Sequence, residues 1–339
     1  MGVRLTPITI RHPTTLEALR GRTVAVDGNL ELYQFLSIMR TRDGQPLQDS
    51  KGRITSHLNG LVFRTTRLMA DYDIRPVFVF DGPPPELKRD EIRKRREARE
   101  KSQREYEAAV TAGDYATAWS KAVMTSRLTR PMVDEAKTLL SLLGIPWIQA
   151  PSEGEAQAAF LARRGDVWAA SSKDYDSLLF GAPRLVRFLA IGGKEFLPSR
   201  GRFRNVPPEV LDLQENLAAL GLTRERLIDA AILVGTDFAP GVKGIGPKGA
   251  VKKVRDWGSL EAAPEPIRAQ LPANLADIRE FFLRPPVDES PIPTPHGIQD
   301  DAVIRFLCEE RDFSRARVEG ALERLKEAAP HTRRLEDFG

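Results

Sequence analysis

Ile74-Arg75-Pro76-Val77-Phe78-Val79-Phe80-Asp81-Gly82 carries the clearest strand signal in this chain. Its apolar run is short, is rich in β-branched and aromatic residues, and stops at an acidic residue followed by glycine. This pattern is typical of a fully buried strand that ends in a turn.

Two other runs of the same kind flank this one in the sequence. Residues 23–26 stop at Asp27, and residues 166–170 lead into Asp174. In open parallel sheets, ligands bind beyond the carboxyl ends of the strands. We therefore expect Asp27, Asp81 and Asp174 to converge at one edge of a sheet, although they lie far apart in the sequence.

Helical patterns alternate with these strands. Apolar residues recur at helical spacing in four segments, which are residues 30–39, 57–71, 132–143 and 223–234. Alternating strands and helices predict an α/β fold, with a central, mostly parallel twisted sheet and helices on both faces. A proline-rich connector (residues 285–295) precedes a last helix pair at residues 300–308 and 315–328.

The composition limits the chemistry. The chain has 339 residues, 41% of them hydrophobic, with one cysteine (Cys308) and four scattered histidines. A single cysteine excludes an intrachain disulfide and a cysteine-built zinc site, so a metal would be held by carboxylates and would be a hard cation such as Mg²⁺. The sequence contains neither an apolar run long enough to span a membrane nor a secretory signal, which predicts a soluble intracellular protein.

A strongly basic segment interrupts the α/β pattern. Residues 88–104 contain nine Lys and Arg against four Asp and Glu and almost no apolar residue. Together with a second polar helical stretch, residues 114–128, the segment resembles a helical hairpin inserted into the core. The alternative is an ordinary solvated helix with salt bridges along its surface.

Seven acidic residues occur at predicted element boundaries. Each has a local alternative: Ser152 and Glu155 have the spacing of a capping box, Asp174 could cap a helix, and Asp81 could begin a turn. Taken together, a convergent acid cluster is costly unless cations neutralise it, which favours two divalent ions and chemistry at phosphate. The seven are Asp27, Asp81, Glu153, Glu155, Asp174, Asp176 and Asp237.

A glycine-rich stretch, residues 241–250, points to a phosphate partner as well. Gly244 and Gly246 let backbone N–H groups approach a phosphate, and a helix begins near Pro247. The lysines that flank it are Lys243, Lys248, Lys252 and Lys253. We expect sequence-independent binding of a nucleic-acid backbone here, with a plain helix-linking turn as the alternative.

The sequence as a whole resembles a flap endonuclease of the structure-specific 5′-nuclease (FEN/XPG) superfamily, in its archaeal, short-tailed form. The similarity runs from residue 1 to residue 338. The motifs that carry it are Val26-Asp27 with Leu32-Tyr33-Gln34-Phe35-Leu36, Val79-Phe80-Asp81-Gly82 with Pro84-Pro85, Gly144-Ile145-Pro146, Ala150-Pro151-Ser152-Glu153-Gly154-Glu155-Ala156, Asp174-Tyr175-Asp176-Ser177-Leu178-Leu179-Phe180-Gly181, and Gly235-Thr236-Asp237-Phe238 with Gly244-Ile245-Gly246-Pro247-Lys248.

The resemblance implies a domain organisation. Residues 1–330 would form a single 5′-nuclease domain, and residues 331–339 a flexible tail that binds a sliding clamp. Within the domain, the family's parts would be an N-terminal region (1–87), a helical arch or gateway (88–130), an internal region (131–260) with a helix–two-turn–helix element at about 225–260, and C-terminal helices (261–330).

It also implies roles at the catalytic centre. Asp27, Asp81, Glu153 and Glu155 would gather around one Mg²⁺, and Asp174, Asp176 and Asp237 around a second, with Mn²⁺ as a substitute. Lys88 and Arg95 would contact the scissile phosphate, and their spacing of seven places them on one helix face. Tyr33 would stack on a base beside the cleaved bond; a core aromatic is an equally weighted alternative.

Further residues would meet DNA or a protein partner. By the same resemblance the DNA contacts are Gly2, Thr55, Lys243, Gly244, Gly246, Lys248, Lys252 and Lys253, with a potassium ion at the helix–two-turn–helix. Leu335 and Phe338 would anchor the tail on the clamp (PCNA), although the tail lacks the family's leading Gln and final aromatic residue. Pro83 and Gly249 replace a common Lys and a frequent Arg.

The function implied is a monomeric, Mg²⁺-dependent phosphodiesterase. It would cut 5′ flaps at junctions of single-stranded and duplex DNA in replication and repair, with 5′–3′ exonuclease activity, by two-metal-ion hydrolysis. Two alternatives remain: a related nuclease that acts mainly on single-stranded RNA, and a catalytically inactive scaffold for DNA junctions.

Overall fold

The computed structural model describes residues 2–41, 45–114, 117, 127–189, 194–197 and 202–328. A seven-stranded sheet of order β1-β9-β6-β5-β2-β3-β4 lies at the centre. Five neighbouring strands are parallel, and the antiparallel strands β9 (Glu209–Asp212) and β1 (His12–Pro13) extend one edge. The parallel strands are β6 (Arg184–Arg187), β5 (Ala169–Ser171), β2 (Thr23–Asp27), β3 (Arg75–Phe80) and β4 (Trp147–Gln149). The mostly parallel sheet predicted from the sequence is confirmed.

Side chains of the central strands point alternately into two hydrophobic clusters. In β3, Val77 and Val79 join one cluster, whereas Phe78 and Phe80 join the other. Because successive residues of a strand face opposite sides, a continuous apolar run requires cover on both faces. This is why β3 has no polar residue between Val77 and Phe80.

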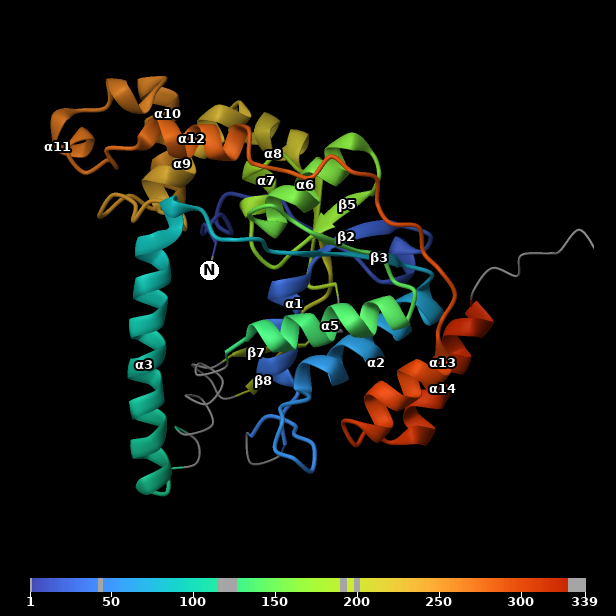
Figure 1. The fold of residues 1–339 in the computed structure, drawn as a ribbon. Coiled ribbons are helices and arrows are strands. Elements are labelled where there is room, and N and C mark those ends of the chain that lie inside the picture. Colours follow the sequence, from blue (N-terminus) through green and yellow to red (C-terminus); the bar gives the residue numbers. More distant parts are fainter. Residues whose placement is uncertain are drawn as a thin grey trace, which may run out of the picture.

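Helices cover both faces, as Figure 1 shows. One face packs against α6 (Gly154–Arg164), α7 (Asp176–Leu179), α8 (Leu213–Leu220), α9 (Arg224–Val234), α10 (Pro247–Trp257) and α12 (Leu275–Leu283). The other packs against α1 (Gly28–Ile38), α2 (Ser56–Tyr72), α5 (Arg130–Leu142), α13 (Asp300–Ile304) and α14 (Arg315–Ala328). A short helix, α11 (Glu265–Arg268), lies between α10 and α12, and a π-helical turn, Arg305–Glu309, follows α13.

The basic segment forms one long helix. After a 3₁₀ turn at Glu86–Lys88, α3 spans Arg89–Thr111 and runs along one side of the molecule in Figure 1. Near its far end, the hydroxyl of Tyr106 accepts a hydrogen bond from the side-chain amide of Gln45 at 2.8 Å. It extends beyond the predicted end at residue 104, because the next residues are good helix formers, and it stops just before Gly113, which has a φ of 69°. The second predicted hairpin stretch, residues 114–128, lies almost wholly outside the described residues.

Other predicted boundaries need small corrections. The strand expected at residues 166–170 begins only at Ala169, because Asp166 and Val167 lie in the turn after α6, although the N–H of Trp168 already bonds to the carbonyl of Thr23. A separate two-stranded sheet pairs β7 (Lys194–Leu197) with β8 (Arg202–Asn205), and the sequence reasoning missed it. In the described part of the chain, no helix is both long and apolar enough to cross a membrane.

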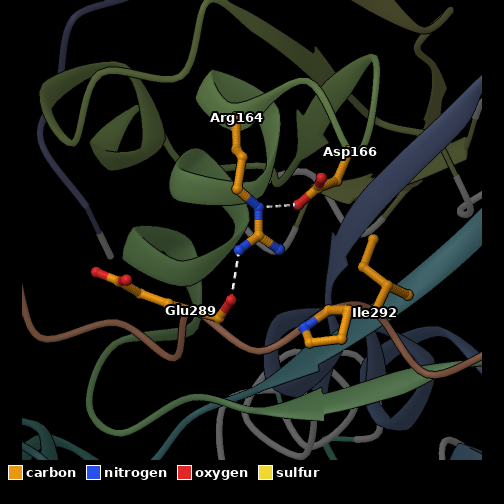
Figure 2. Close-up of a pocket in the computed structure, with 5 residues that line it drawn as sticks. Arg164, Asp166, Glu289 and Ile292 are labelled. Carbon is orange, nitrogen blue, oxygen red and sulfur yellow. Dashed lines mark hydrogen bonds and ion pairs between the residues drawn. The ribbon is translucent and has the colours of Figure 1, made fainter.

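The proline-rich connector is fastened along the surface between α12 and α13. The side-chain amide of Gln157 exchanges two hydrogen bonds with the backbone of Asp288, and the guanidinium of Arg164 donates to the carbonyls of Glu289 and Ser290. Figure 2 shows the shallow pocket that Arg164 lines with Asp166 and the connector. Arg164 ends α6 at the opposite end from Glu153 and Glu155, so this pocket is remote from the acids.

Candidate active site

The carboxyl ends of β2 and β3 bring the first two acids together. Asp27 ends β2 and caps α1, since its carboxylate accepts a hydrogen bond from the N–H of Leu30 at 3.0 Å. Asp81 follows β3 and accepts one from the N–H of Gly154 at 2.7 Å, at the start of α6. Both side chains are therefore fixed by helix N-termini, which favour negative charge.

Helix α6 supplies Glu153 and Glu155. The alternative of a capping box formed by Ser152 and Glu155 is wrong: Glu153 occupies the N-cap position without a capping hydrogen bond of its own, and the first N–H of the helix is bound by Asp81. Glu155 instead accepts a hydrogen bond from the hydroxyl of Ser177 at 3.1 Å. The carboxylate of Glu155 turns away from the backbone of its own helix because α7 packs against α6 and brings the hydroxyl of Ser177 within hydrogen-bond distance.

The chain's N-terminus is built into the cluster beside Asp174 and Asp176. The N–H of Gly2 donates to Asp174 at 3.0 Å, and the N–H of Val3 donates to Asp176 at 2.9 Å. A Cβ atom at position 2 would lie 2.6 Å from a carboxylate oxygen of Asp176, so only glycine fits. The alternative in which Asp174 caps a helix is wrong, since Tyr175 precedes α7.

Two cations from the basic segment meet the seventh acid, Asp237, in the loop after α9. The ammonium of Lys88 lies 2.5 Å from Glu153 and 3.2 Å from Asp237. The guanidinium of Arg95 lies 2.6 Å from Asp237 and 2.9 Å from Glu91. Lys88 and Arg95 thus share one anionic partner, although Lys88 lies in the 3₁₀ turn before α3 and not on the helix face predicted for both.

Burial and mutual repulsion raise the pKa of most of these acids. Burial, then the charge of Asp81, raises the pKa of Asp27 well above its usual range; burial and Asp176 do the same for Glu155. Burial, then the charges of Asp237 and Asp174, raises the pKa of Asp176 to about 7. Burial also raises the pKa of Asp237, but Lys88 and Arg95 outweigh it, so this pKa lies below normal.

The cluster fits divalent cations by its chemistry. All seven groups are oxygen donors, and the repulsion that raises their pKa values is what bound cations would relieve. Within the described residues, no three acids are arranged so that they could hold one ion, and the predicted division into a group of four and a group of three is not apparent. Lys88 and Arg95 neutralise Glu153 and Asp237 instead.

The comparisons with known proteins bear directly on this site. Residues 3–102 match the XPG N-terminal domain and residues 144–237 the XPG I-region, and together these regions contain all seven acids. The chain is 50% identical to "Flap endonuclease 1" of Caldivirga maquilingensis, covering 97% of this chain and 96% of that protein. It is 49% identical to the protein of the same name from Pyrococcus furiosus, with the same coverage.

The chain belongs to the flap endonuclease family. Members are structure-specific 5′ nucleases of the XPG superfamily and depend on divalent metal ions. The fold agrees with that of the flap endonuclease from Methanococcus jannaschii, with a TM-score of 0.75, 38% identity and coverage of 96% and 98%. It also resembles the catalytic core of Rad2 in complex with DNA substrate, with a TM-score of 0.70, 25% identity and coverage of 95% and 97%.

Three other predicted DNA contacts of this flap endonuclease have different surroundings. Tyr33 is 37% exposed on α1, so the alternative of a core aromatic is wrong. Gly2 lies in the acid cluster. Thr55 is buried and precedes α2, and its neighbour His57 is bonded to Glu135 at 3.0 Å, so these side chains offer little surface to a DNA strand.

The predicted duplex-binding element is formed by α9, the loop at residues 235–246 and α10. Gly244 has a φ of 84°, which favours glycine, and Gly246 precedes α10, whose N-terminus has no side-chain cap. Lys243, Lys248 and Lys252 are exposed. Lys253 instead lies over the ring of Trp257, with its ammonium 5.1 Å from the ring centre.

Sequence reasoning missed Glu31, which is 5% exposed on α1. In the described part of the chain, its Oε2 is buried without a hydrogen-bond partner. Burial raises the pKa of Glu31 to about 8, and the positive charge of Arg64 only partly opposes this. The sequence did contain a signal for a buried acid here, because Glu31 lies one helical turn after Asp27 and between two leucines.

Glu31 should make the stability of the protein depend on pH. A carboxyl whose pKa is raised in the folded state destabilises the fold as pH rises from about 4.5 through about 8. The shift corresponds to roughly 4 kcal/mol between pH 5 and pH 9. We expect Glu31→Gln to be more stable than the native chain at pH 9 but not at pH 5, as measured by urea unfolding.

The control is Glu86→Gln, because the side chain of Glu86 is 91% exposed. It should leave the stability unchanged at both pH values. A Glu31→Gln effect of equal size at pH 5 and pH 9 would contradict the assignment of a raised pKa.

Proposed function

We propose that this chain cuts branched DNA at the junction between a single-stranded 5′ flap and duplex, with 5′–3′ exonuclease activity, in replication and repair. The observation that carries the proposal is the pairing of seven acids at the carboxyl edge of the sheet with Lys88 and Arg95 of the basic segment. An acidic cluster that faces fixed cations is suited to hydrolysis of a phosphodiester.

The cofactors in this proposal are two Mg²⁺ ions held by the seven carboxylates, with Mn²⁺ as a substitute. When bound, two divalent ions activate water and neutralise charge on the phosphate. Lys88 and Arg95 bind the scissile phosphate, because the groups that pair with Asp237 can equally pair with a phosphodiester. The exposed ring of Tyr33 stacks on a nearby base.

The remaining parts bind the rest of the substrate. Helix α3 forms one side of an arch around the single-stranded flap. The lysines around α10 and its uncapped N-terminus bind the backbone of downstream duplex, and a potassium ion binds to carbonyls of the preceding loop. The enzyme acts as a monomer.

A substrate panel tests this function. Labelled 5′-flap, nicked and bubble DNA and free single-stranded RNA are offered with Mg²⁺ and with a chelator. We expect rapid cleavage of the flap near the junction, with Mg²⁺ only. Preferential cleavage of the RNA would favour the single-stranded RNA nuclease instead, and no cleavage of any flap would favour a scaffold.

The duplex-binding element can be tested separately. Each of Lys248→Ala and Lys252→Ala should weaken binding to all duplex sequences alike and lower the slope of log affinity against log salt by about 1, if each lysine contacts one phosphate. Fluorescence anisotropy at several salt concentrations measures this. Lys326→Ala on α14 removes an exposed lysine elsewhere and should leave the slope unchanged. An unchanged slope in the first two variants would refute the assignment.

A sliding clamp is the proposed protein partner. The predicted anchors, Leu335 and Phe338, lie outside the described residues, so the proposal rests on the tail's resemblance to the family motif. Clamp pull-down should succeed with the full chain and fail when the chain ends at residue 330. Equal recovery of both proteins would dismiss this partner.

A further inference from the structure

Arg187 lies against the segment that carries Asp174 and Asp176. It ends β6, is 7% exposed, and reaches across to the neighbouring turn after β5. Its Nε donates to the carbonyl of Lys173 at 2.9 Å, and its Nη1 donates to the hydroxyl of Tyr175 at 2.8 Å. One guanidinium therefore holds the residues immediately before and after Asp174.

The surroundings of Arg187 keep this contact in one geometry. Its guanidinium lies 4.3 Å from the ring centre of Tyr175 and 4.6 Å from that of Phe188. Glu209 of β9 supplies the opposing charge at 2.9 Å, and the hydroxyl of Thr6 meets that of Tyr175 at 2.9 Å. A buried cation is tolerated only when it is paired and hydrogen-bonded in this way.

We propose that Arg187 is a positioning residue, which fixes the backbone of the Asp174–Asp176 turn and thereby supports the affinity of these two carboxylates for a divalent ion. The N–H groups of Gly2 and Val3 hold the two carboxylates directly, whereas Arg187 holds the backbone and side chain beside them. The inference rests on the proposed function, in which Asp174 and Asp176 are metal ligands. Mutation of groups that orient metal ligands typically weakens metal affinity or activity by about 10- to 100-fold.

The fork of the guanidinium is the feature that matters. Two nitrogens act at once, Nε on a backbone carbonyl and Nη1 on a hydroxyl, and a lysine ammonium in the same place could not preserve both directions. Arg187→Lys should therefore behave as a partial loss, and Arg187→Met as a complete one. Tyr175→Phe keeps the ring but removes the hydroxyl contact, and it should cause a smaller loss than either.

The test measures binding of Mn²⁺ to each full-length variant by calorimetry, without DNA, together with the Mg²⁺ concentration that gives half-maximal flap cleavage. We expect Arg187→Met to weaken Mn²⁺ binding about tenfold and to raise the half-saturating Mg²⁺ by a similar factor. Excess Mg²⁺ should restore much of the cleavage rate. Arg187→Lys should fall between this variant and the native protein.

Arg311→Met is the matched control for lost stability. Like Arg187, Arg311 has a largely buried guanidinium, which lies 4.1 Å from the ring centre of Phe306 and pairs with Glu135 at 2.8 Å. Unlike Arg187, it lies in the C-terminal part of the chain, between the π-helical turn and α14. It should lower the melting temperature without changing Mn²⁺ affinity. Native Mn²⁺ affinity in both Arg187→Met and Arg187→Lys would overturn the proposal and make Arg187 purely structural.

Asp174→Asn and Asp176→Asn separate this inference from the function on which it rests. If these two variants bind Mn²⁺ like the native protein, the assignment of the metal ligands fails. If they lose Mn²⁺ while Arg187→Met keeps native affinity, only the role of Arg187 fails. Should Arg187→Met not fold, Arg187→Lys and Tyr175→Phe decide the question, with native affinity in both again overturning it.

Discussion

Cleavage of a 5′-flap substrate is expected to fall on the order of a thousandfold when Asp176 is replaced by asparagine. The substitution removes a negative charge from the cluster but keeps an oxygen that can accept the hydrogen bond from Val3. Folding should not suffer. Burial and neighbouring acids raise the pKa of Asp176 to about 7, so its charge destabilises the metal-free fold as pH rises through about 7.

This variant therefore has a two-part signature. Single-turnover cleavage with saturating Mg²⁺ should be nearly abolished, while the melting temperature of the metal-free protein at pH 8 should be equal to or above that of the native chain. Asp166→Asn is the control, because Asp166 pairs with Arg164 at the far end of α6. Near-native cleavage by Asp176→Asn would show that the acid cluster is not the catalytic centre.

The second large effect is expected at Lys88 and Arg95. Replacing either with methionine should lower the single-turnover rate by about a hundredfold, because each removes a fixed cation from the phosphate that it is proposed to bind. Burial alone would lower the pKa of Lys88, but the charges of Glu153 and Asp237 outweigh it, so Lys88 stays charged throughout the assay range. The loss should therefore be the same at pH 7 and pH 9.

The neighbouring residue Arg96 provides the control. It lies on the same helix, but its exposed guanidinium faces Glu100 rather than the acids. Arg96→Met should retain a near-native rate, whereas flap binding should remain measurable in all three variants. A uniform loss across Lys88, Arg95 and Arg96 variants would indicate general electrostatic attraction to DNA and contradict a specific role at the scissile phosphate.

Much of this site follows from local sequence. The strands before Asp27 and Asp81 show as short apolar runs, and the parallel sheet then requires their carboxyl ends to share an edge. The spacing of Lys88 and Arg95 predicted a common helix face, but Lys88 ends the 3₁₀ turn before α3 and only Arg95 lies on the helix; both nevertheless reach Asp237. The strand predictions succeeded because the alternation of apolar residues and the end of a strand can be read from residues that are neighbours in the sequence.

Other features could not be predicted in this way. The spacing of Ser152 and Glu155 favoured a capping box, yet Ser177 on another helix takes Glu155 as its acceptor. Thr55 follows the family pattern but is buried, because the loop before α2 folds back so that the N–H of Thr55 bonds to Leu47. The sequence left open whether the ring of Tyr33 is exposed or part of the core, and only the packing of α1 on the sheet shows that it faces outward.

The sequence alone therefore determined the α/β class, the seven acids and the basic segment opposite them, since these depend on composition, period and short motifs. Tertiary structure alone decided which groups hold the acids in place: the N-terminus against Asp174 and Asp176, and Arg187 against Lys173 and Tyr175. Those contacts join segments that no local pattern relates. They form because burying a charge is tolerable only where the fold brings a partner within hydrogen-bond distance.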